Sequence, residues 1–334
     1  MYEEWLTMTE ATVAPAVRVR GLCKSYGSKQ VLAGVDLDVP PGTVFALLGP
    51  NGAGKTTTVH ILSTLVQPDA GEAQVAGHDL RKDPDAVRSA IGLTGQFAAV
   101  DKQLTGEENL RLIARLRHLD RAAAQRRIAD LLELFELSEA ARKPLHTYSG
   151  GMRRKLDLAL TLLDRPQIIF LDEPTTGLDP RSRQAMWDIV RDVVAQGTTV
   201  LLTTQYLEEA DQLADWIAVL DGGRLVADGT SEQLKARIGG GRIELRFDTA
   251  ATLDAAARAV PGSTREDETL TLTAPMDALG TRSIRTVLGQ LDRARIEPLS
   301  LGVQTPNLDD VFLALTGATG KSGATGKKEE SVTR

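Results

Sequence analysis

Cysteine, aromatic residues and long apolar runs are all scarce in this sequence. Its 334 residues include a single cysteine, Cys23, and only 4% Phe, Trp and Tyr. One cysteine excludes an internal disulfide framework and suits a reducing compartment. No apolar run approaches the roughly 20 residues that cross a bilayer as a helix. We therefore expect no membrane span, and any role at a membrane must depend on a partner.

Positive charge is not in excess either. The formal net charge is −6 at pH 7, with 42% hydrophobic and 25% charged residues. This balance is typical of a globular protein and argues against a broad surface for nucleic acid, so we expect no nucleic-acid partner.

The chain is long enough for two domains, and its ends have little structural signal. Residues 1–16 lack the basic start and apolar core of a secretory signal, and we interpret them as a flexible leader. Residues 317–334 are small, polar and charged, which predicts a disordered tail. Between them we expect a large domain over 17–238 and an accessory domain over 240–316, with a linker-like stretch at 236–242.

Strands and helices alternate through the large domain, which predicts an α/β sheet flanked by helices. The expected strands are three within 17–48 and others at 91–96, 166–173, 198–204 and 216–229. The expected helices begin after Gly54, fill a helical subdomain at about 97–163, span 180–197 and follow Gln205. Thr105 and Glu108 have the spacing of a capping box. The accessory domain shows a shorter α+β series.

A glycine-rich segment, "GPNGAGKTT", separates a buried strand from a helix. It fits the pattern G-x-x-x-x-G-K-[ST] in the context that this pattern requires. Backbone N–H groups of such a loop wrap a pyrophosphate at the positive end of the helix. Lys55 can reach the β- and γ-phosphates, and the Thr56 hydroxyl can bind Mg²⁺. The predicted nucleotide site comprises Gly49, Pro50, Asn51, Gly52, Ala53, Gly54, Lys55, Thr56 and Thr57.

Two adjacent carboxylates end the later buried strand "IIFLDE". Asp172 would hold Mg²⁺, and Glu173 would polarise the attacking water. An acidic pair alone is more often a helix cap or a solvated edge. Beside a phosphate-binding loop, it favours Mg²⁺-dependent hydrolysis of ATP.

The segment "YSGGMRRKL" at 148–156 precedes this acidic strand, and "TTGLDP" at 175–180 follows it. On its own the first segment is a serine N-cap before a helix. Together with the phosphate-binding loop, Gln96 and the acidic pair, the order resembles the ATP-binding subunit of an ABC transporter over about residues 17–235. The resemblance implies the fold of that nucleotide-binding domain: a P-loop core, an antiparallel β subdomain and a helical subdomain.

The resemblance also implies an assembly. Two copies pair head to tail around two ATP molecules, and the γ-phosphate bound by one copy meets the signature residues Ser149, Gly150 and Gly151 of the other. Asp179, in the loop "TTGLDP", is likewise expected to be a nucleotide-binding residue. The helices of 105–160 dock on a separate membrane permease, which would hold the protein at the cytoplasmic face of the cell membrane.

Other residues receive roles from the same resemblance. Tyr26 would stack on adenine, although it also fits a half-exposed strand tyrosine. Gln96 would touch Mg²⁺ and the attacking water and link the ATP state to the permease.

Three residues depart from the family pattern: Tyr148 replaces a leucine, Met152 a glutamine, and Gln205 a histidine that contacts the γ-phosphate. An amide can still make that contact but does not titrate near neutral pH. We therefore expect Gln205 to sense the phosphate while Glu173 alone acts as the base. A turn residue without a role is the alternative.

Within the family, "TTQYLEEAD", "YSGGMRRKLDLA" and the closing "TPNLDDVFLALTG" are most similar to drug exporters of the daunorubicin-resistance type. This similarity predicts an ATPase that drives export of a hydrophobic drug or a lipid-like compound. One alternative is an ATPase of this family that acts on DNA or ribosomes; the short segment between P-loop and signature, and the single P-loop, argue against it. The other is an ATP-gated binding subunit with weak hydrolysis, which the intact Glu173 disfavours.

Overall fold

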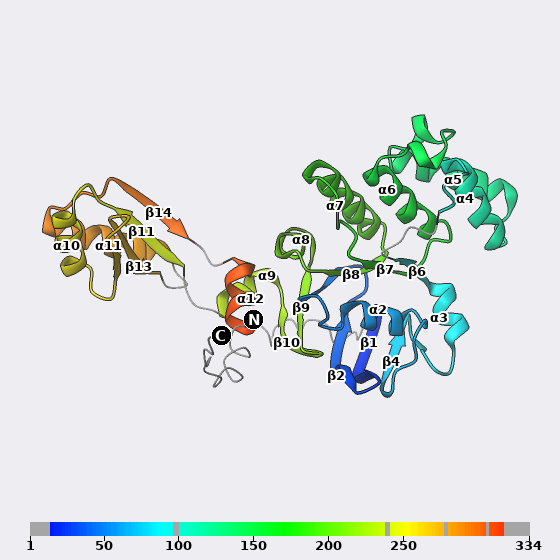
Figure 1. The fold of residues 1–334 in the computed structure, drawn as a ribbon, viewed down its shortest axis with the longest axis horizontal. Coiled ribbons are helices and arrows are strands. Elements are labelled where there is room, and N and C mark those ends of the chain that lie inside the picture. Colours follow the sequence, from blue (N-terminus) through cyan, green and yellow to red (C-terminus); the bar gives the residue numbers. More distant parts are fainter. Residues whose placement is uncertain (1–13, 96–99, 238–240, 277–279, 305–306, 317–334) are drawn as a thin grey trace, which may run out of the picture. The chain divides into compact units, whose positions relative to one another are not determined.

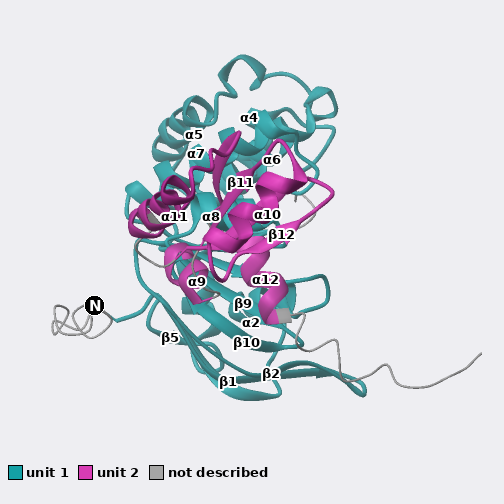
Figure 2. Ribbon diagram, turned by 90° about the vertical axis from the view of Figure 1, so that its left-hand side faces the viewer, with its two compact units in different colours: residues 1–230 teal, residues 231–334 magenta. Residues whose placement is uncertain are grey.

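The computed structural model describes residues 14–95, 100–237, 241–276, 280–304 and 307–316. The expected tail, most of the expected leader and Gln96 lie outside these residues. The chain divides into two compact units, Met1–Thr230 and Ser231–Arg334 (Figures 1 and 2).

The core of the first unit is a six-stranded sheet. Three of its strands consist entirely of buried residues, as expected for apolar runs covered on both faces. Five strands are parallel where they pair, and only the edge hairpin is antiparallel. In spatial order the strands are β10 (Arg224–Gly229), β9 (Trp216–Asp221), β3 (Val44–Leu48), β8 (Thr199–Thr204), β7 (Ile168–Asp172) and β6 (Ile91–Thr94).

The register of this sheet brings three distant segments to one edge. Leu48 at the end of β3 pairs with Thr204 at the end of β8, and Asp172 at the end of β7 pairs with Thr203. Carboxyl ends of parallel strands lie at the same edge, where ligands of open α/β sheets bind. The glycine-rich loop, the acidic pair and Gln205 all follow these strand ends.

A second sheet is antiparallel and packs with helix α2 (Lys55–Leu62) against one face of the first. The shared core includes Val19, Leu37, Ile61 and Phe170. In spatial order its strands are β2 (Lys29–Val39), β1 (Val17–Tyr26), β4 (Ala70–Val75) and β5 (His78–Asp79). The sequence predicted β1 and β2 but neither β4 and β5 nor the short helix α3 (Pro84–Ala90).

Helices α7 (Pro180–Ala195) and α8 (Leu207–Leu213) lie on the other face of the six-stranded sheet (Figure 1). The helical region contains α4 (Gly106–Leu116), α5 (Arg121–Leu134), the 3₁₀ turns η1 (Ser138–Ala140) and η2 (Leu145–Thr147), and α6 (Gly150–Thr161). The capping box is confirmed. The Thr105 hydroxyl accepts from the Glu108 N–H at 3.2 Å, and the Glu108 carboxylate accepts from the Thr105 N–H at 2.8 Å.

The second unit contains a four-stranded antiparallel sheet with two helices packed on one face. Its core includes Ile243, Leu245, Leu253, Leu272 and Leu291. The spatial order is β12 (Thr264–Glu266), β13 (Thr271–Pro275), β11 (Arg242–Arg246) and β14 (Ser300–Gln304), with α10 (Ala250–Ala259) and α11 (Gly280–Ala294).

Two further helices of this unit, α9 (Ser231–Arg237) and α12 (Leu308–Thr316), pack on each other. The expected linker at 236–242 therefore needs correction at both ends, since Arg237 ends a helix and Arg242 begins a strand. The domain limits drawn from the sequence stay a prediction.

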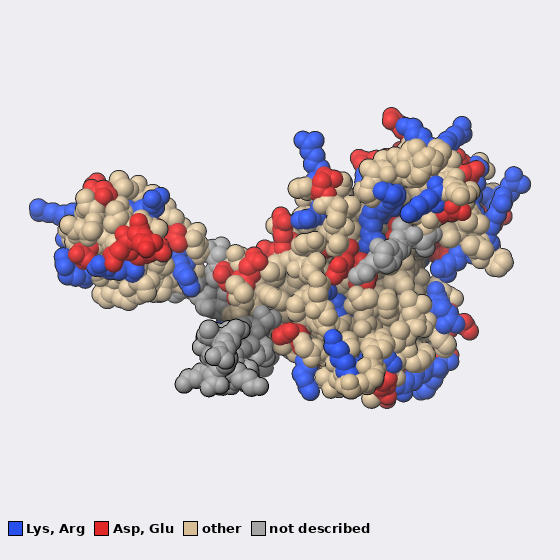
Figure 3. All heavy atoms as spheres, viewed as in Figure 1, with Lys and Arg blue, Asp and Glu red and all other residues tan. Residues whose placement is uncertain are grey.

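Charged side chains of both signs occur side by side on each unit, on the face that Figure 3 shows. In the part of the chain that the structure describes, no helix is long and apolar enough to cross a membrane.

Candidate ATP site

The glycine-rich loop runs from the end of β3 to the start of α2. Gly49 donates its N–H to the Thr204 carbonyl at 3.3 Å, and a Cβ at Gly49 would lie 2.2 Å from the Leu220 carbonyl oxygen. Gly54 caps α2 with a φ of 112°, a left-handed conformation that favours glycine. As a glycine, Gly54 has no side chain to cap α2, so it leaves the first N–H groups of the helix to an anion.

Lys55 lies at the floor of this loop with only 5% of its surface exposed. Its ammonium donates to the carbonyls of Gly49 at 2.8 Å and Pro50 at 3.1 Å, and lies 3.8 Å from a Glu173 carboxylate oxygen. Burial lowers the pKa of Lys55, and the negative charges of Glu173 and Asp172 oppose that shift. The Lys55 ammonium is thus held between the glycine-rich loop and the acidic pair.

Asp172 is buried and accepts two hydrogen bonds on one oxygen. The Thr56 hydroxyl donates at 3.2 Å and the Thr203 hydroxyl at 2.5 Å. The Thr56 hydroxyl and the Asp172 carboxylate are hard oxygen donors of the type that Mg²⁺ prefers. Mg²⁺ keeps several waters and substrate phosphates as ligands, so two protein oxygens at the phosphate loop fit it.

Glu173 follows β7 in an unusual backbone conformation. Its φ is 49°, a left-handed value for a residue that is not glycine. Its N–H donates to both the carbonyl and the hydroxyl of Thr203 at 3.1 Å. The Thr176 hydroxyl donates to its carboxylate at 3.3 Å. These contacts keep the carboxylate beside Lys55.

A pocket of about 420 Å³ lies beside Lys55, Thr56 and Glu173. It extends from Tyr26 at the end of β1 to Glu173. The Tyr26 ring is half exposed and lies 5.5 Å from the Lys24 ammonium. The lining residues are Tyr26, Lys29, Val31, Asn51, Gly52, Gly54, Lys55, Thr56, Thr57 and Glu173. A flat aromatic surface at one end and phosphate-binding groups at the other suit a nucleotide.

The expected signature residues, Ser149, Gly150 and Gly151, lie at the start of α6. Ser149 caps α6 by accepting from the Met152 N–H at 3.1 Å. A Cβ at Gly150 would meet nothing within 4 Å, whereas one at Gly151 would lie 2.8 Å from the Ser182 hydroxyl. None of these signature residues lines the pocket at the P-loop.

Asp179 joins the signature through Ser182. It caps α7 by accepting from the N–H groups of Arg181 and Ser182 at 3.1 Å each, and the Ser182 hydroxyl donates to it at 2.6 Å. These hydrogen bonds, that of the Ser182 hydroxyl first, lower the pKa of Asp179. The structure therefore brings Asp179 next to Gly151, apart from the phosphate loop.

Gln205 lies between the end of β8 and the start of α8. It is half buried, and its side chain makes no hydrogen bond to another described residue. The turn is held by its neighbours instead, because the Thr204 hydroxyl accepts from the Tyr206 N–H at 2.9 Å. An amide with no hydrogen-bond partner among the described residues can bind a ligand at this strand edge.

Tyr148 has a structural role that the sequence did not reveal. Its ring is buried, and its hydroxyl donates to the Ala140 carbonyl at 2.7 Å. A Cβ at Gly106 would lie 2.3 Å from that hydroxyl. The missing side chain of Gly106 thus leaves room for the Tyr148 ring. Through these contacts Tyr148, which stands where the family has leucine, links the signature to α4 and η1.

Glu209 is a buried carboxylate that the sequence did not reveal. This carboxylate is 1% exposed and accepts from the Thr175 hydroxyl at 2.8 Å and the Trp187 ring N–H at 3.1 Å. Burial raises its pKa, against hydrogen bonds from Thr204, Thr175 and Trp187 and the charge of Arg183. It ties α8, which follows Gln205, to the loop that follows Glu173. An apparent surface pair, "EE", gave no signal of this burial.

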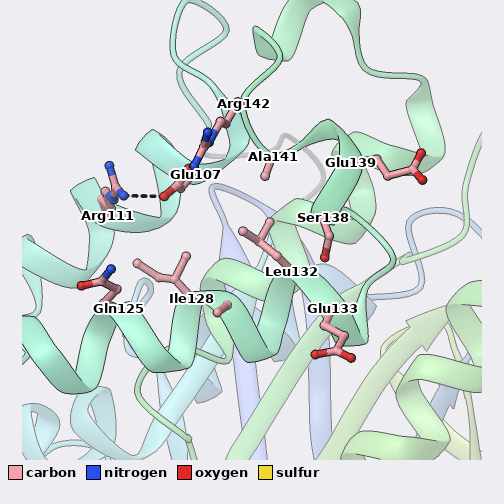
Figure 4. A pocket seen from close by; sticks show the side chains of 11 residues that line it. Glu107, Arg111, Gln125, Ile128, Leu132, Glu133, Ser138, Glu139, Ala141 and Arg142 are labelled. Carbon is pink, nitrogen blue, oxygen red and sulfur yellow. Dashed lines mark hydrogen bonds and ion pairs between the residues drawn. The ribbon is translucent and has the colours of Figure 1, made fainter.

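A groove of about 580 Å³ lies in the helical region among α4, α5 and η1 (Figure 4). Its apolar part is formed by Ile128, Ala129 and Leu132, and Glu107 and Arg111 form an ion pair at its side. The remaining lining residues are Gln125, Glu133, Ser138, Glu139, Ala141 and Arg142.

The sheet order, the phosphate loop and the acidic pair define a P-loop nucleoside triphosphatase with an additional C-terminal α+β region. The family model "ABC transporter" matches residues 32–176. The chain is 52% identical over 305 residues, 90% of this chain and 96% of the relative, to the daunorubicin resistance ATP-binding protein DrrA3 of Streptomyces coeruleorubidus. It belongs to the ABC transporter ATP-binding family, and it is an ABC-type ATPase that binds ATP.

Two further comparisons agree. The daunorubicin/doxorubicin resistance ATP-binding protein DrrA of Streptomyces peucetius is 47% identical, with 95% of this chain and 98% of the relative covered. A solved structure described as the ATP-binding subunit of an ABC transporter has a TM-score of 0.61 at 31% identity, covering 67% of this chain and 93% of that one. The expected fold class is confirmed, and membership of this family implies a permease partner.

Proposed function

We propose that this chain is the ATP-hydrolysing subunit of a drug exporter and works as a head-to-tail dimer around two Mg-ATP. The observation that carries the proposal is the division of the site. The P-loop pocket is lined by Lys55, Thr56 and Glu173, and Asp172 is bonded to Thr56, whereas Ser149, Gly150 and Gly151 are not among the residues that line it. A second copy turned head to tail would add its signature to this pocket and complete it.

Mg²⁺ would be held by Thr56 and Asp172, with Gln96 as a further ligand. Bound there, the cation would neutralise charge on the β- and γ-phosphates. The phosphates would lie against the N–H groups of the loop and of the first turn of α2. Lys55 would exchange its hydrogen bonds to loop carbonyls for bonds to phosphate oxygens, and Tyr26 would cover the adenine.

Hydrolysis would follow from the position of Glu173. Its carboxylate would accept a proton from water as that water attacks the γ-phosphate. Gln205 would donate its amide to a γ-phosphate oxygen, and Gln96 would orient the water. Ser149, Gly150 and Gly151 of the partner subunit would hold the same phosphate from the other side, so cleavage would release the two copies.

The proposed cargo is a hydrophobic drug or a lipid-like compound, and its support is the full-length similarity to proteins named for daunorubicin resistance. A separate permease would carry it and would hold this chain at the cytoplasmic face of the cell membrane. The helical region would contact the permease, and the groove with its apolar Ile128 and Leu132 is a candidate surface for that contact.

The test uses the chain purified together with the membrane protein encoded beside it. We expect Mg-ATP turnover that a hydrophobic drug stimulates, and a fall of about 10²–10⁴-fold in the Glu173→Gln variant, which loses its general base. Lys55→Ala should lose nucleotide binding in an equilibrium titration, whereas Lys82→Ala, at an exposed lysine outside the pocket, should retain it.

Gln205 favours one second candidate, an ATP-gated binding subunit with weak hydrolysis. The same assay separates the two. Wild-type turnover no faster than that of Glu173→Gln would favour the binding subunit and contradict the proposed ATPase cycle.

A further inference from the structure

Arg154 is a nearly buried arginine in α6, with 14% of its side chain exposed. Its Nε donates to the Pro174 carbonyl at 2.9 Å. Its Nη2 donates to the carbonyls of Asp172 at 3.0 Å and Glu173 at 3.3 Å. Three consecutive carbonyls around the proposed base are therefore held by one guanidinium.

The other terminal nitrogen of Arg154 reaches a different strand. Nη1 donates to the Gly95 carbonyl at 2.8 Å and lies 3.4 Å from the Asp157 carboxylate. Gly95 follows β6 and directly precedes Gln96 in the sequence. One planar group thus ties the end of β6 to the end of β7, and both ends carry residues proposed to act on the attacking water.

The backbone at Glu173 has an unfavourable conformation that the hydrogen bonds from Arg154 help to hold. Glu173 has a φ of 49°, a conformation that persists only where the surrounding structure holds it. Its N–H is fixed by Thr203, and its carbonyl by Arg154. The Glu173 carbonyl also accepts from the Thr176 N–H at 3.3 Å. Removing Arg154 would leave it that one donor, would take the guanidinium away from the Asp172 and Pro174 carbonyls, and would let the turn relax.

The helix that carries Arg154 begins at the signature. Ser149 caps it, and Arg154 follows Gly150 by four residues, a rise of about 6 Å along the axis. In the proposed dimer, Ser149 and Gly150 hold the ATP of the partner's P-loop. Through Arg154, the same short helix contacts the backbone of Glu173, the proposed base for this chain's own ATP, and of Gly95.

We propose that Arg154 is a positioning residue that couples the two ATP sites of the dimer: a phosphate bound at the signature sets, through α6 and its guanidinium, the position of Glu173 in the other site. This inference rests on the proposed function. Only a guanidinium presents five donors in a rigid fork. A lysine keeps the charge but directs its donors from a single point.

The test is Arg154→Lys in the complex with the permease, with Arg154→Gln as a second variant. We expect kcat to fall about 10²-fold, as for a misplacement of about 1 Å, and the Hill coefficient for ATP to fall from above 1 to 1. Nucleotide affinity at the isolated subunit's P-loop should stay unchanged, which also reports that the variant is folded.

Arg127→Lys is the matched control. Arg127 is also partly buried and donates to a backbone carbonyl, that of Leu162 at 2.9 Å, but within the helical region. It should leave both kcat and the Hill coefficient unchanged.

Three outcomes would overturn the coupling. They are an Arg154→Lys variant that retains kcat and cooperativity, one that loses kcat with its Hill coefficient intact, and a wild-type Hill coefficient of 1. Each leaves the proposed ATPase standing if Glu173→Gln still abolishes turnover. Wild-type turnover no faster than Glu173→Gln would instead refute the proposed function itself.

Discussion

The Thr56 hydroxyl donates a hydrogen bond of 3.2 Å to the Asp172 carboxylate, across 116 residues of sequence. This contact joins the first turn of α2 to the end of β7. It exists because β3 and β7 both pair with β8, so that their carboxyl ends share an edge. In the proposed function, these two oxygens would hold the Mg²⁺ that accompanies ATP.

Asp172→Asn should therefore weaken the response to Mg²⁺. The amide removes the negative charge but keeps the shape, so we expect the Mg²⁺ concentration for half-maximal turnover to rise at least about tenfold. Binding of ATP in the absence of Mg²⁺ should change little. Asp188→Asn, an exposed carboxylate on α7, is the control. An unchanged Mg²⁺ requirement would refute the role of Asp172.

Gln205→Ala and Gln205→His test the unusual amide. A hydrogen bond to a charged phosphate contributes about 1.5–3 kcal/mol, so the alanine variant should lose roughly 10- to 150-fold in turnover. The histidine variant should retain turnover and gain a dependence on pH near 6.5, since imidazole titrates there. Steady-state phosphate release over a pH series measures both. Full turnover in the alanine variant would make Gln205 a turn residue only.

Gly151 and Gly150 offer a matched pair. A Cβ at Gly151 would lie 2.8 Å from the Ser182 hydroxyl and would turn it away from Asp179, whereas one at Gly150 has open space. Gly151→Ala should therefore cost about 1 kcal/mol of unfolding free energy, the worth of one hydrogen bond, and Gly150→Ala should cost none.

A double-mutant cycle with Ser182→Ala attributes that cost to the contact. In the Ser182→Ala background there is no hydroxyl to displace and only the 3.2 Å contact with the Cβ of residue 182 remains, so Gly151→Ala should then cost less. Chemical denaturation of the four proteins measures this. Equal costs of Gly151→Ala in both backgrounds would show that the loss has another origin.

Sequence predicted the parts of the site whose signal is local. A glycine run between a strand and a helix, and two acids at the end of an apolar strand, each carry their geometry within a few residues. The short strands β4 and β5 gave no such signal, because "AGEAQV" has small and polar residues at most positions. The glycines that follow helix α9 made its last two residues, Ala236 and Arg237, part of the expected linker.

The residues that sequence missed act through distant or backbone partners. Tyr148 needs the space at Gly106, and Arg154 binds carbonyls, which every residue possesses. No residue type or spacing announces such a contact. The departure at Tyr148 was visible in the sequence, but its structural role came only from the packing around it.

Glu209 predicts a dependence of stability on pH. Burial raises its pKa above the ordinary value of 4.5. At a pH between the pKa of the unfolded chain and the raised pKa of the native state, the native carboxyl keeps a proton that the unfolded chain has released. The native state then binds more protons, so its free energy of unfolding falls as pH rises through this window.

Glu209→Gln removes the titration while keeping an acceptor for Thr175 and Trp187. The difference in Tm, variant minus wild type, should therefore increase as pH rises from about 4 to about 8. Glu208→Gln is the control, because its side chain is 68% exposed and pairs only weakly with Arg183 at 3.4 Å. That difference should stay flat over the same range. A flat difference for Glu209→Gln as well would contradict the raised pKa, because it would mean that this carboxyl has the same pKa in the native and the unfolded state.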